Sequence, residues 1–236
     1  MRYISLPDDN QRRLVFYLAI EEYVADVLGE GFFLWQVPPT VIFGRNQDME
    51  AEVNLPYCRE HGIQYYRRKS GGGCVYSDYG NVMISYVVPS GGVRDVFKEY
   101  LDMLCSALTG LGMNAVSSSN NDVLVGDRKV SGNAFFVHPS ASIVHGTLLY
   151  DADFNELSKA ITPSREKLES HGVKSVRQRV ANLKDLGIGV DIRGLKASLK
   201  AAFTDSEYVL CPSDIAAIEK IEATYLDPAF IVGKNR

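Results

Sequence analysis

The pattern of apolar and polar positions predicts a helix close to the N-terminus. Leu14, Leu18 and Leu28 recur at helical spacing, which indicates a helix with one buried face. Asp8 and Asp9 precede the pattern, and Asp side chains accept hydrogen bonds from the first backbone N–H groups of a helix. We therefore expect a helix that begins at this acidic pair and ends near Leu28.

Beyond this helix, apolar runs of strand length alternate with longer helical patterns. We expect strands over residues 32–37, 40–43, 63–66, 82–88, 122–125, 128–134 and 143–150, and helices over 54–62, 93–111, 153–161, 192–203 and 212–225. Neighbouring strands are joined by short turns as often as by helices. This order predicts an α+β fold with a mixed, largely antiparallel sheet flanked by helices, in one domain over residues 1–236.

Three consecutive glycines, Gly71–Gly73, interrupt the pattern between two strand-like runs. With no Cβ to block approach, their backbone N–H groups lie open, and two arginines, Arg67 and Arg68, come just before them. Open N–H groups beside guanidinium groups suit a phosphate or a carboxylate. A β-hairpin with a glycine turn is the alternative interpretation of this segment.

Composition and charge narrow the classes of protein. Hydrophobic residues make up 46% of the 236 positions, charged residues make up 23%, and the net charge is −4, so the composition indicates a globular protein without a nucleic-acid-binding surface. No apolar run approaches the roughly 20 residues of a membrane span, and the N-terminus has no signal-peptide pattern. The four cysteines and four histidines are scattered, which favours neither disulfides nor a zinc site. We expect a cytoplasmic protein.

Several common catalytic motifs are absent from the sequence. It contains no G-x-x-x-x-G-K-[ST], no G-x-S-x-G and no G-x-G-x-x-G at the start of a helix. There remain the glycine segment, the pair Asn121–Asp122 and Lys129, a strand lysine near the small Gly132. Such a set could bind a nucleotide and stabilise charge on a phosphate and an acyl carbonyl, with Mg²⁺ supporting the phosphates. A solvent-exposed lysine without a function is the alternative.

Seven segments in one order make the sequence resemble the lipoate–protein ligase A family, within the biotin and lipoate ligase fold. The resemblance covers about residues 10 to 235. The segments are 44–47, 67–75, 78–81, 121–122, 129–134, 145–149 and 174–180. The G-R-G-R-x pattern of biotin ligases is absent, which argues against that branch of the fold.

The resemblance implies a two-step reaction and a set of site residues. Lipoate would attack the α-phosphate of ATP to give lipoyl-adenylate, and a lysine of a lipoyl domain would then take the lipoyl group. Lys129 matches the essential lysine of the family. Asp122 matches a residue on the side of the site where the phosphates and magnesium bind. The residues expected to bind ATP and lipoate are Arg68, Ser70, Gly71, Gly72, Gly73, Cys74, Val75, Asn81, Asn121, Asp122, Gly132, Ala134, His145 and Gly146.

The resemblance also implies partners. The acceptors would be lipoyl-domain proteins: acyltransferase subunits of 2-oxoacid dehydrogenases and the H protein of glycine cleavage. Well-known bacterial relatives have a further C-terminal domain, and this chain stops where their catalytic domain would end. Either a separate accessory protein would take that place, or the chain would only transfer the lipoyl group from preformed lipoyl-adenylate. Arg177 and Arg179 could dock an acidic lipoyl domain or hold the local loop.

The sequence departs from the family at one site position and leaves two other functions open. Many relatives have His before Asp78, where this chain has Ser77. One alternative function is an octanoyl- or lipoyltransferase that forms a thioester on Cys74, because Arg67 and Arg68 could stabilise a thiolate there. The other is a module that binds a lipoyl group or a nucleotide without catalysis.

Overall fold

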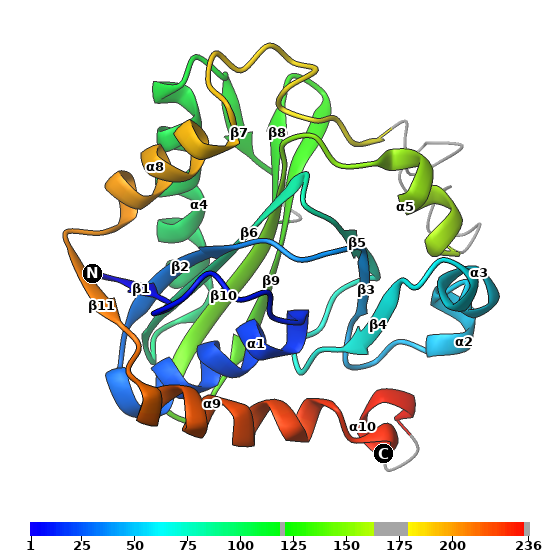
Figure 1. The fold of residues 1–236 in the computed structure, drawn as a ribbon. Helices are drawn as coiled ribbons and strands as arrows, with labels where there is room; N and C mark the ends of the chain where they lie inside the picture. Colours follow the sequence, from blue (N-terminus) through cyan, green and yellow to red (C-terminus); the bar gives the residue numbers. More distant parts are fainter. Residues whose placement is uncertain (119–120, 163–178, 234–236) are drawn as a thin grey trace.

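The computed structural model describes residues 1–118, 121–162 and 179–233. Their centre is an eight-stranded sheet in the order β11-β1-β2-β6-β10-β9-β8-β7 (Figure 1). β1 runs parallel to both β2 and β11, and the other neighbouring pairs are antiparallel. These strands are β1 (Arg2–Ser5), β2 (Gly31–Trp35), β6 (Asn81–Pro89), β7 (Ala115–Ser117), β8 (Asp122–Val125), β9 (Arg128–Val137), β10 (Ala141–Leu149) and β11 (Ser206–Val209).

A second sheet of three strands lies beside the first. Its central strand β3 (Thr40–Phe43) pairs parallel with β4 (Gln64–Arg67) and antiparallel with β5 (Val75–Ser77). Short helices α2 (Met49–Glu52), α3 (Leu55–Glu60) and α5 (Phe154–Ala160) surround it. The glycine segment connects β4 to β5 across β3, so the hairpin interpretation is wrong. Its two strands are not neighbours.

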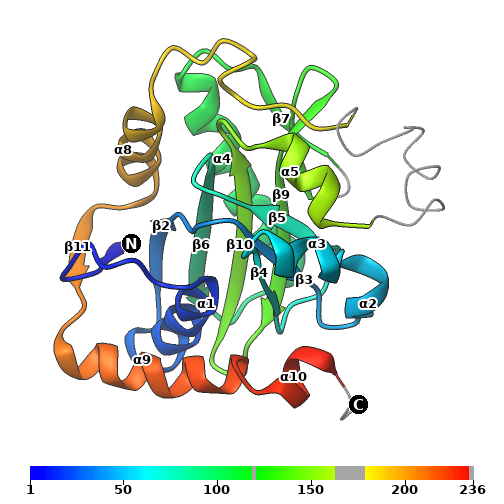
Figure 2. The same ribbon diagram turned by 45° about the vertical axis from the view of Figure 1, so that its right-hand side comes forward.

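Helices cover both faces of the large sheet (Figure 2). One core contains residues of α1 (Leu14–Tyr23) and α9 (Pro212–Tyr225), and the other contains residues of α4 (Val93–Gly110) and α8 (Ile192–Phe203). Phe33 and Trp35 of β2 belong to the first core, whereas Phe32 and Leu34 belong to the second. Because alternate side chains of a strand point to opposite faces, burial on both faces requires the continuous apolar run seen in the sequence. The mixed, largely antiparallel sheet flanked by helices is confirmed.

The first helix differs from the prediction at its start. It begins at Leu14 after Arg13, which makes no side-chain cap, and it continues into a π-helical turn over Val24–Leu28. Asp8 instead accepts a hydrogen bond from the backbone of Asn10 and forms a 3.2 Å ion pair with Arg12. Every residue of α1 is buried, including two glutamates, so the helix packs on all sides.

The sequence pattern missed the shortest elements. β1, β5, β7, β11, α2 and α10 (Pro228–Val232) each have only three to five residues. Periodicity gives little signal over such lengths, and β1 pairs with β11 about two hundred residues away. The long and strongly patterned elements lie where the sequence placed them.

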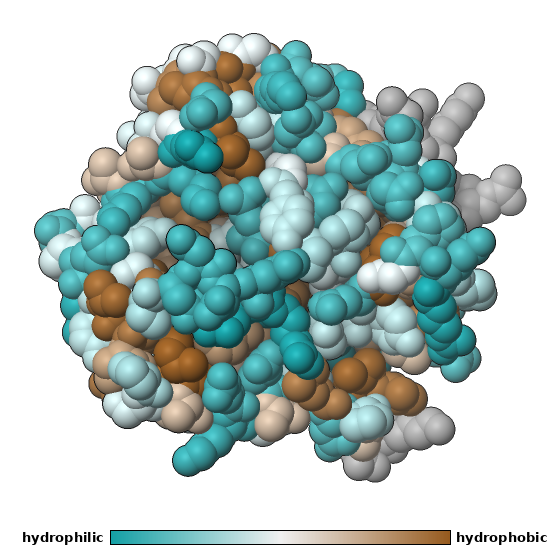
Figure 3. Space-filling model, viewed as in Figure 1, coloured by the Kyte–Doolittle hydropathy of each residue, from teal (hydrophilic) through white to brown (hydrophobic). Residues whose placement is uncertain are grey.

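The face seen in Figure 3 is mostly hydrophilic, with hydrophobic residues in separate patches. None of the helices that the structure describes is both long and apolar enough to cross a bilayer.

Candidate functional site

A cavity of about 480 Å³ lies between the small sheet and strands β8 to β10. The glycine segment with Arg68 and Ile42 forms one wall, and residues of β8, β9 and β10 form the other. Apolar side chains of α1, β2 and β6 also line the cavity, namely Leu18, Trp35 and Met83. The combination of an apolar part with a few convergent polar groups is typical of a small-molecule site.

Arg68 shapes the glycine segment from within. Its buried guanidinium donates to the carbonyl oxygens of Gly71 and Gly73, each at 2.7 Å, and to Ser70 Oγ at 3.0 Å. Burial lowers the pKa of Arg68 from 12.5 to about 10, so the side chain stays charged near pH 7. Gly72 has a φ of +89°, and a Cβ there would lie 2.9 Å from Arg68 Nη2. Only glycine suits this position.

The backbone of the glycine segment presents open N–H groups. Within the part of the chain that the structure describes, no protein atom accepts a hydrogen bond from the N–H groups of Gly71, Gly72 or Gly73. Arg68 donates hydrogen bonds to the carbonyl oxygens of Gly71 and Gly73. The N–H groups of the segment therefore remain available to an anion.

Arg67, the neighbouring arginine, has a different environment from the one we expected. Its buried side chain donates to backbone carbonyl oxygens of the loop 44–47, including that of Gln47 at 2.7 Å, and of the last turn of α10, including that of Ile231 at 2.9 Å. A guanidinium group suits the exposed carbonyl groups at a helix C-terminus. Arg67 therefore joins α10 to the loop and is not among the residues that line the cavity.

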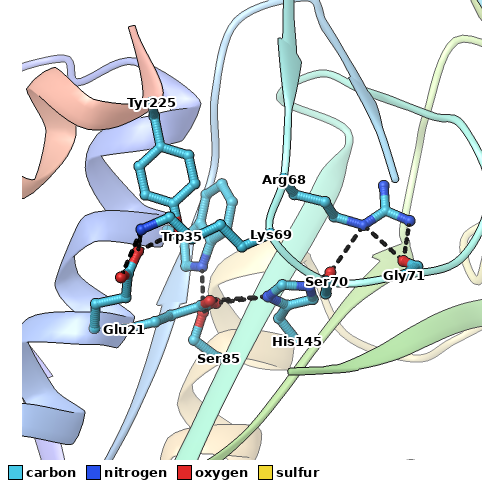
Figure 4. Close-up of polar contacts among 10 residues, drawn as sticks. Glu21, Trp35, Arg68, Lys69, Ser70, Gly71, Ser85, His145 and Tyr225 are labelled. Atoms are coloured by element: carbon cyan, nitrogen blue, oxygen red, sulfur yellow. Dashed lines mark hydrogen bonds and ion pairs between the residues drawn. The ribbon is translucent and has the colours of Figure 1, made fainter. Parts of the chain in front are cut away.

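His145 connects β10 to the glycine segment and to α1 (Figure 4). Its Nε2 lies 2.7 Å from Ser70 Oγ, and its Nδ1 lies 2.9 Å from a carboxylate oxygen of Glu21. The Glu21 carboxylate also accepts a 2.6 Å hydrogen bond from Ser85, which in turn accepts one from Trp35 Nε1 at 3.0 Å. This buried chain fixes the imidazole beside the cavity.

Lys69 continues the series of cations and contacts the next glutamate of α1. Its Nζ lies 2.7 Å from Glu22 and 4.7 Å from the centre of the Tyr225 ring, and Tyr225 donates a 2.5 Å hydrogen bond to Glu22 (Figure 4). Three consecutive cations thus have three kinds of partner: Arg67 contacts α10, Arg68 contacts the glycine segment, and Lys69 contacts α1 and α9.

Lys129 reaches the cavity from β9 and pairs with Asp122 of β8. Lys129 Nζ lies 2.8 Å from Asp122 Oδ1, and Arg179 Nη2 contacts the other carboxylate oxygen, Oδ2. A Cβ at Gly132 would lie 2.7 Å from Lys129 Nζ, so the glycine makes room for the ammonium group. Gly132, the small residue near Lys129 in the sequence, thus leaves space for the lysine side chain.

The cavity offers few side chains that could bind Mg²⁺. Among the described residues there is no group of three or more His, Cys, Asp or Glu side chains that could hold a metal ion. Asp122 offers one carboxylate at the cavity, and both of its oxygens are paired with cations. Mg²⁺ usually binds one or two carboxylates together with substrate phosphates, so Asp122 fits a metal ion that arrives with a nucleotide.

Most of the residues that the sequence proposed for the site lie together. Eleven of them line the cavity: Arg68, Gly72, Gly73, Cys74, Val75, Asp122, Lys129, Gly132, Ala134, His145 and Gly146. Ser70 and Gly71 do not line it, but they hold Arg68 and His145. Arg177 lies outside the described residues.

Two asparagines do not line the cavity. Asn81 is fully buried at the start of β6, with its amide 3.5 Å from Asp78 Oδ1. Asn121 has a φ of +61°, and its carbonyl oxygen accepts a 2.8 Å hydrogen bond from Asn133, which does line the cavity. Both positions indicate support of the surrounding backbone.

Sequence reasoning missed Glu21, Trp35 and Arg179 as members of this site. Buried acidic residues in an otherwise apolar helix were an available signal for Glu21, because a buried carboxylate needs a partner. Trp35 gave no signal beyond its place in an apolar strand. Arg179 stood in a cationic run that predicted docking or loop support, and its contact with Asp122 agrees with loop support.

Several known proteins are similar to this chain in sequence. Residues 14–204 match the family model for the lipoyl protein ligase A/B catalytic domain. Lipoate–protein ligase 1 of Staphylococcus aureus is 37% identical over 245 aligned positions, which cover 100% of this chain and 74% of the relative. The chain spans 53% to 74% of the length of four such curated relatives.

Two solved structures share the fold over nearly the whole chain. One is a bipartite lipoate–protein ligase from Thermoplasma acidophilum, studied with its E2 lipoyl domain, with a TM-score of 0.86, 26% identity and coverage of 100% of this chain and 97% of that one. The other is a lipoate–protein ligase A bound with ATP, with a TM-score of 0.83, 24% identity and 98% coverage of both chains.

Proposed function

This chain belongs to the lipoyl protein ligase A/B catalytic domain family, and on that basis we propose that its cavity carries out both steps of lipoate attachment. A carboxylate oxygen of lipoate attacks the α-phosphorus of ATP, the bond to pyrophosphate breaks, and lipoyl-adenylate forms. The amine of an acceptor lysine then attacks the carbonyl carbon, the bond to AMP breaks, and the amine loses a proton.

The observation that carries this proposal is that Lys129 and the glycine segment line the same cavity. In both steps negative charge grows on a phosphate oxygen or on the acyl carbonyl oxygen. An ammonium group on one side and open backbone N–H groups on the other are positioned donors for such charge. Gly72, Gly73, Cys74 and Val75 would lie along the adenylate.

The apolar part of the cavity suits the acyl chain. Leu18, Trp35 and Met83 line it, with His145 and Gly146 beside them on β10. Burial of an eight-carbon chain contributes several kcal/mol, at about 0.8 kcal/mol for each CH₂ group. A Cβ at Gly146 would lie 1.9 Å from Asn133 Oδ1, so the glycine lets β9 and β10 pack closely in this wall.

Asp122 would lie on the side of the cavity at which Mg²⁺ arrives with ATP, and a carboxylate oxygen that it shares with Lys129 or Arg179 would contact the metal. The bound metal would neutralise charge on the phosphates. The guanidinium group of Arg68 already donates hydrogen bonds to carbonyl oxygens of the glycine segment. Arg68 would therefore act on the carboxyl end of the lipoyl group mainly by holding this segment in place.

The acceptor would be a lipoyl domain of a 2-oxoacid dehydrogenase acyltransferase subunit or the H protein of glycine cleavage. The Thermoplasma relative is a bipartite ligase with an E2 lipoyl domain as its partner, which supports an accessory protein here as well. Adenylation would then depend on that second protein.

A reconstitution experiment tests the function. The purified chain is mixed with ATP, Mg²⁺, lipoate and an apo lipoyl domain, with and without a candidate accessory protein. We expect lipoate-dependent pyrophosphate release and lipoylation of the acceptor lysine, measured by mass spectrometry. In a further mixture, preformed lipoyl-adenylate replaces ATP and lipoate. Lipoylation there, together with pyrophosphate release from ATP only when the accessory protein is present, would show that adenylation depends on the partner. Failure of both steps in every mixture would refute the proposal.

A further inference from the structure

The carboxylate of Asp122 is shared between two cations that come from distant parts of the sequence. Lys129 Nζ lies 2.8 Å from Oδ1, and Arg179 Nη2 contacts Oδ2. Asp122 itself is only 6% exposed. The shortest contacts of the two cations are thus made to different oxygens of this carboxylate.

The position of Arg179 is fixed by the backbone next to it. Val180 forms a parallel β-bridge with Lys129, and Ala181 N donates a 2.9 Å hydrogen bond to Lys129 O. Arg128 donates to the carbonyl oxygen of Val180. Arg179 is thus held directly beside the strand that carries the lysine, although fifty residues separate the two in the sequence.

A lysine that serves two transition states must be oriented and also available. Without a second cation, the whole negative charge of the carboxylate would attract the ammonium group and hold it away from the acyl phosphate. A guanidinium group stays charged at all working pH values, so it occupies one oxygen permanently. The remaining oxygen can orient Lys129 without retaining it.

We propose that Arg179 is a positioning residue that acts through Asp122: by occupying Oδ2, it leaves the carboxylate one oxygen with which to aim Lys129 at the reacting acyl phosphate. This inference rests on the proposed function, because it assigns a role toward the reaction that Lys129 serves.

A double-mutant cycle tests this role. In Arg179→Gln, Asp122 can turn both oxygens to Lys129, and we expect kcat for lipoyl-adenylate formation to fall about 10²-fold, as for a misplaced catalytic group. KM for lipoate should stay within about twofold, because the apolar part of the cavity is untouched. In the Asp122→Asn background the same arginine substitution should cost little more, because the carboxylate that would retain Lys129 is gone. Losses that multiply in the double variant would overturn the proposal, since Arg179 would then act directly.

Two further variants separate positioning from folding. Arg179→Lys keeps a cation beside Asp122 and should restore a large part of kcat, and Arg193→Gln, at an exposed arginine of α8, is the matched control and should match the wild type. Melting temperatures of all variants should agree within a few degrees. A loss of activity that follows the melting temperature, without rescue by lysine, would show a structural role only.

A crystal structure of Arg179→Gln gives an answer that does not depend on activity. We expect Lys129 Nζ to lie within hydrogen-bond distance of both Asp122 oxygens. If Lys129 Nζ comes no closer to Oδ2 than it is in the wild type, the inference is wrong even if the ligase activity is established. If the wild type has no activity in any mixture, the proposed function fails, and this structure still decides the relation between the three residues.

Discussion

Ser70 Oγ and His145 Nε2 lie 2.7 Å apart, which joins the glycine segment of the small sheet to β10 of the large one (Figure 4). Both residues are buried, and the contact continues on one side to Arg68 and on the other to Glu21. The two walls of the cavity are therefore held in register by one chain of hydrogen bonds, which reaches α1.

Glu21→Gln should weaken lipoate binding. The amide puts an N–H₂ donor where the carboxylate accepts hydrogen bonds from Ser85 and faces His145, so the imidazole loses its orientation. We expect KM for lipoate to rise about tenfold and the free energy of unfolding to fall by about 1–3 kcal/mol. Glu219→Gln, at an exposed position on α9, is the control for steady-state kinetics and urea unfolding. An unchanged KM would contradict a link between Glu21 and the cavity.

Lys129→Ala should abolish turnover while lipoate binding falls less. The ammonium group is expected to stabilise charge in the transition states, and loss of such a donor costs about 10²–10³-fold in rate. Adenylate formation and transfer from preformed lipoyl-adenylate are measured separately, with lipoate affinity by calorimetry. Lys184→Ala removes an exposed lysine paired with Asp151 and should leave both steps intact. Near-normal turnover of Lys129→Ala would refute the assignment.

Cys74→Ala separates the ligase from a thioester-forming transferase. Cys74 lines the cavity, so its position is compatible with contact to an acyl group. In a ligase the sulfur has no covalent role, and we expect the variant to keep most of its activity. Cys211→Ala, at an exposed cysteine, is the control. A complete loss of transfer, together with an acyl adduct on Cys74 of the wild type in mass spectrometry, would favour the transferase.

Arg67→Met should destabilise the protein. The substitution removes the donors that now satisfy carbonyl oxygens of α10 and of the loop 44–47, and it leaves those groups buried without partners. We expect a loss of at least about 2 kcal/mol in the free energy of unfolding. Arg45→Met, on the same loop but exposed, should change it by less than about 0.5 kcal/mol. Equal effects in urea unfolding would argue against the role of Arg67 in holding α10.

Asp214 makes stability depend on pH in the acid range. Burial by itself raises its pKa, but hydrogen bonds from Tyr23, Cys211 and Tyr208 outweigh this effect and hold the pKa below the usual 3.8. A carboxyl group whose pKa is lower in the folded state stabilises the protein above its unfolded pKa, and this contribution disappears as the pH falls through the folded pKa.

The measurement is urea unfolding of the wild type and Asp214→Asn between pH 7 and pH 3. We expect the variant to be less stable by about 1–3 kcal/mol at pH 7 and the difference to shrink below about pH 4. Asp185→Asn, at an exposed position, should show no such trend. If the difference in the free energy of unfolding between the wild type and Asp214→Asn stays constant from pH 7 to pH 3, the lowered pKa of Asp214 is not the cause of the pH dependence.

The sequence by itself determined the class of fold and most of the cavity. Long elements such as α4 and β10 carry enough apolar positions for their type and extent to follow from periodicity, because each buries a whole face. The glycine segment and Lys129 stood out because consecutive glycines and a small residue near a strand lysine have few structural explanations. The resemblance then joined these segments into one family.

The tertiary structure alone decided which charged groups meet. Arg67, Arg68 and Lys69 are equivalent neighbours in the sequence, yet they contact three different parts of the fold. In β9 the register against β8 shifts between Val123 and Leu124, so Asp122 lies opposite Gly132 while Leu124 lies opposite Lys129. A register shift changes which side chains share a face, and no local pattern encodes it.

The same reason explains Arg179 and Glu21. Their partners, Asp122 and His145, are separated from them by 57 and 124 residues. Contacts of that kind depend on how the chain closes over long distances, whereas helix and strand formation depend on neighbours within a few residues. Sequence periodicity therefore identified the walls of the cavity, and only the packed structure showed which charges hold them together.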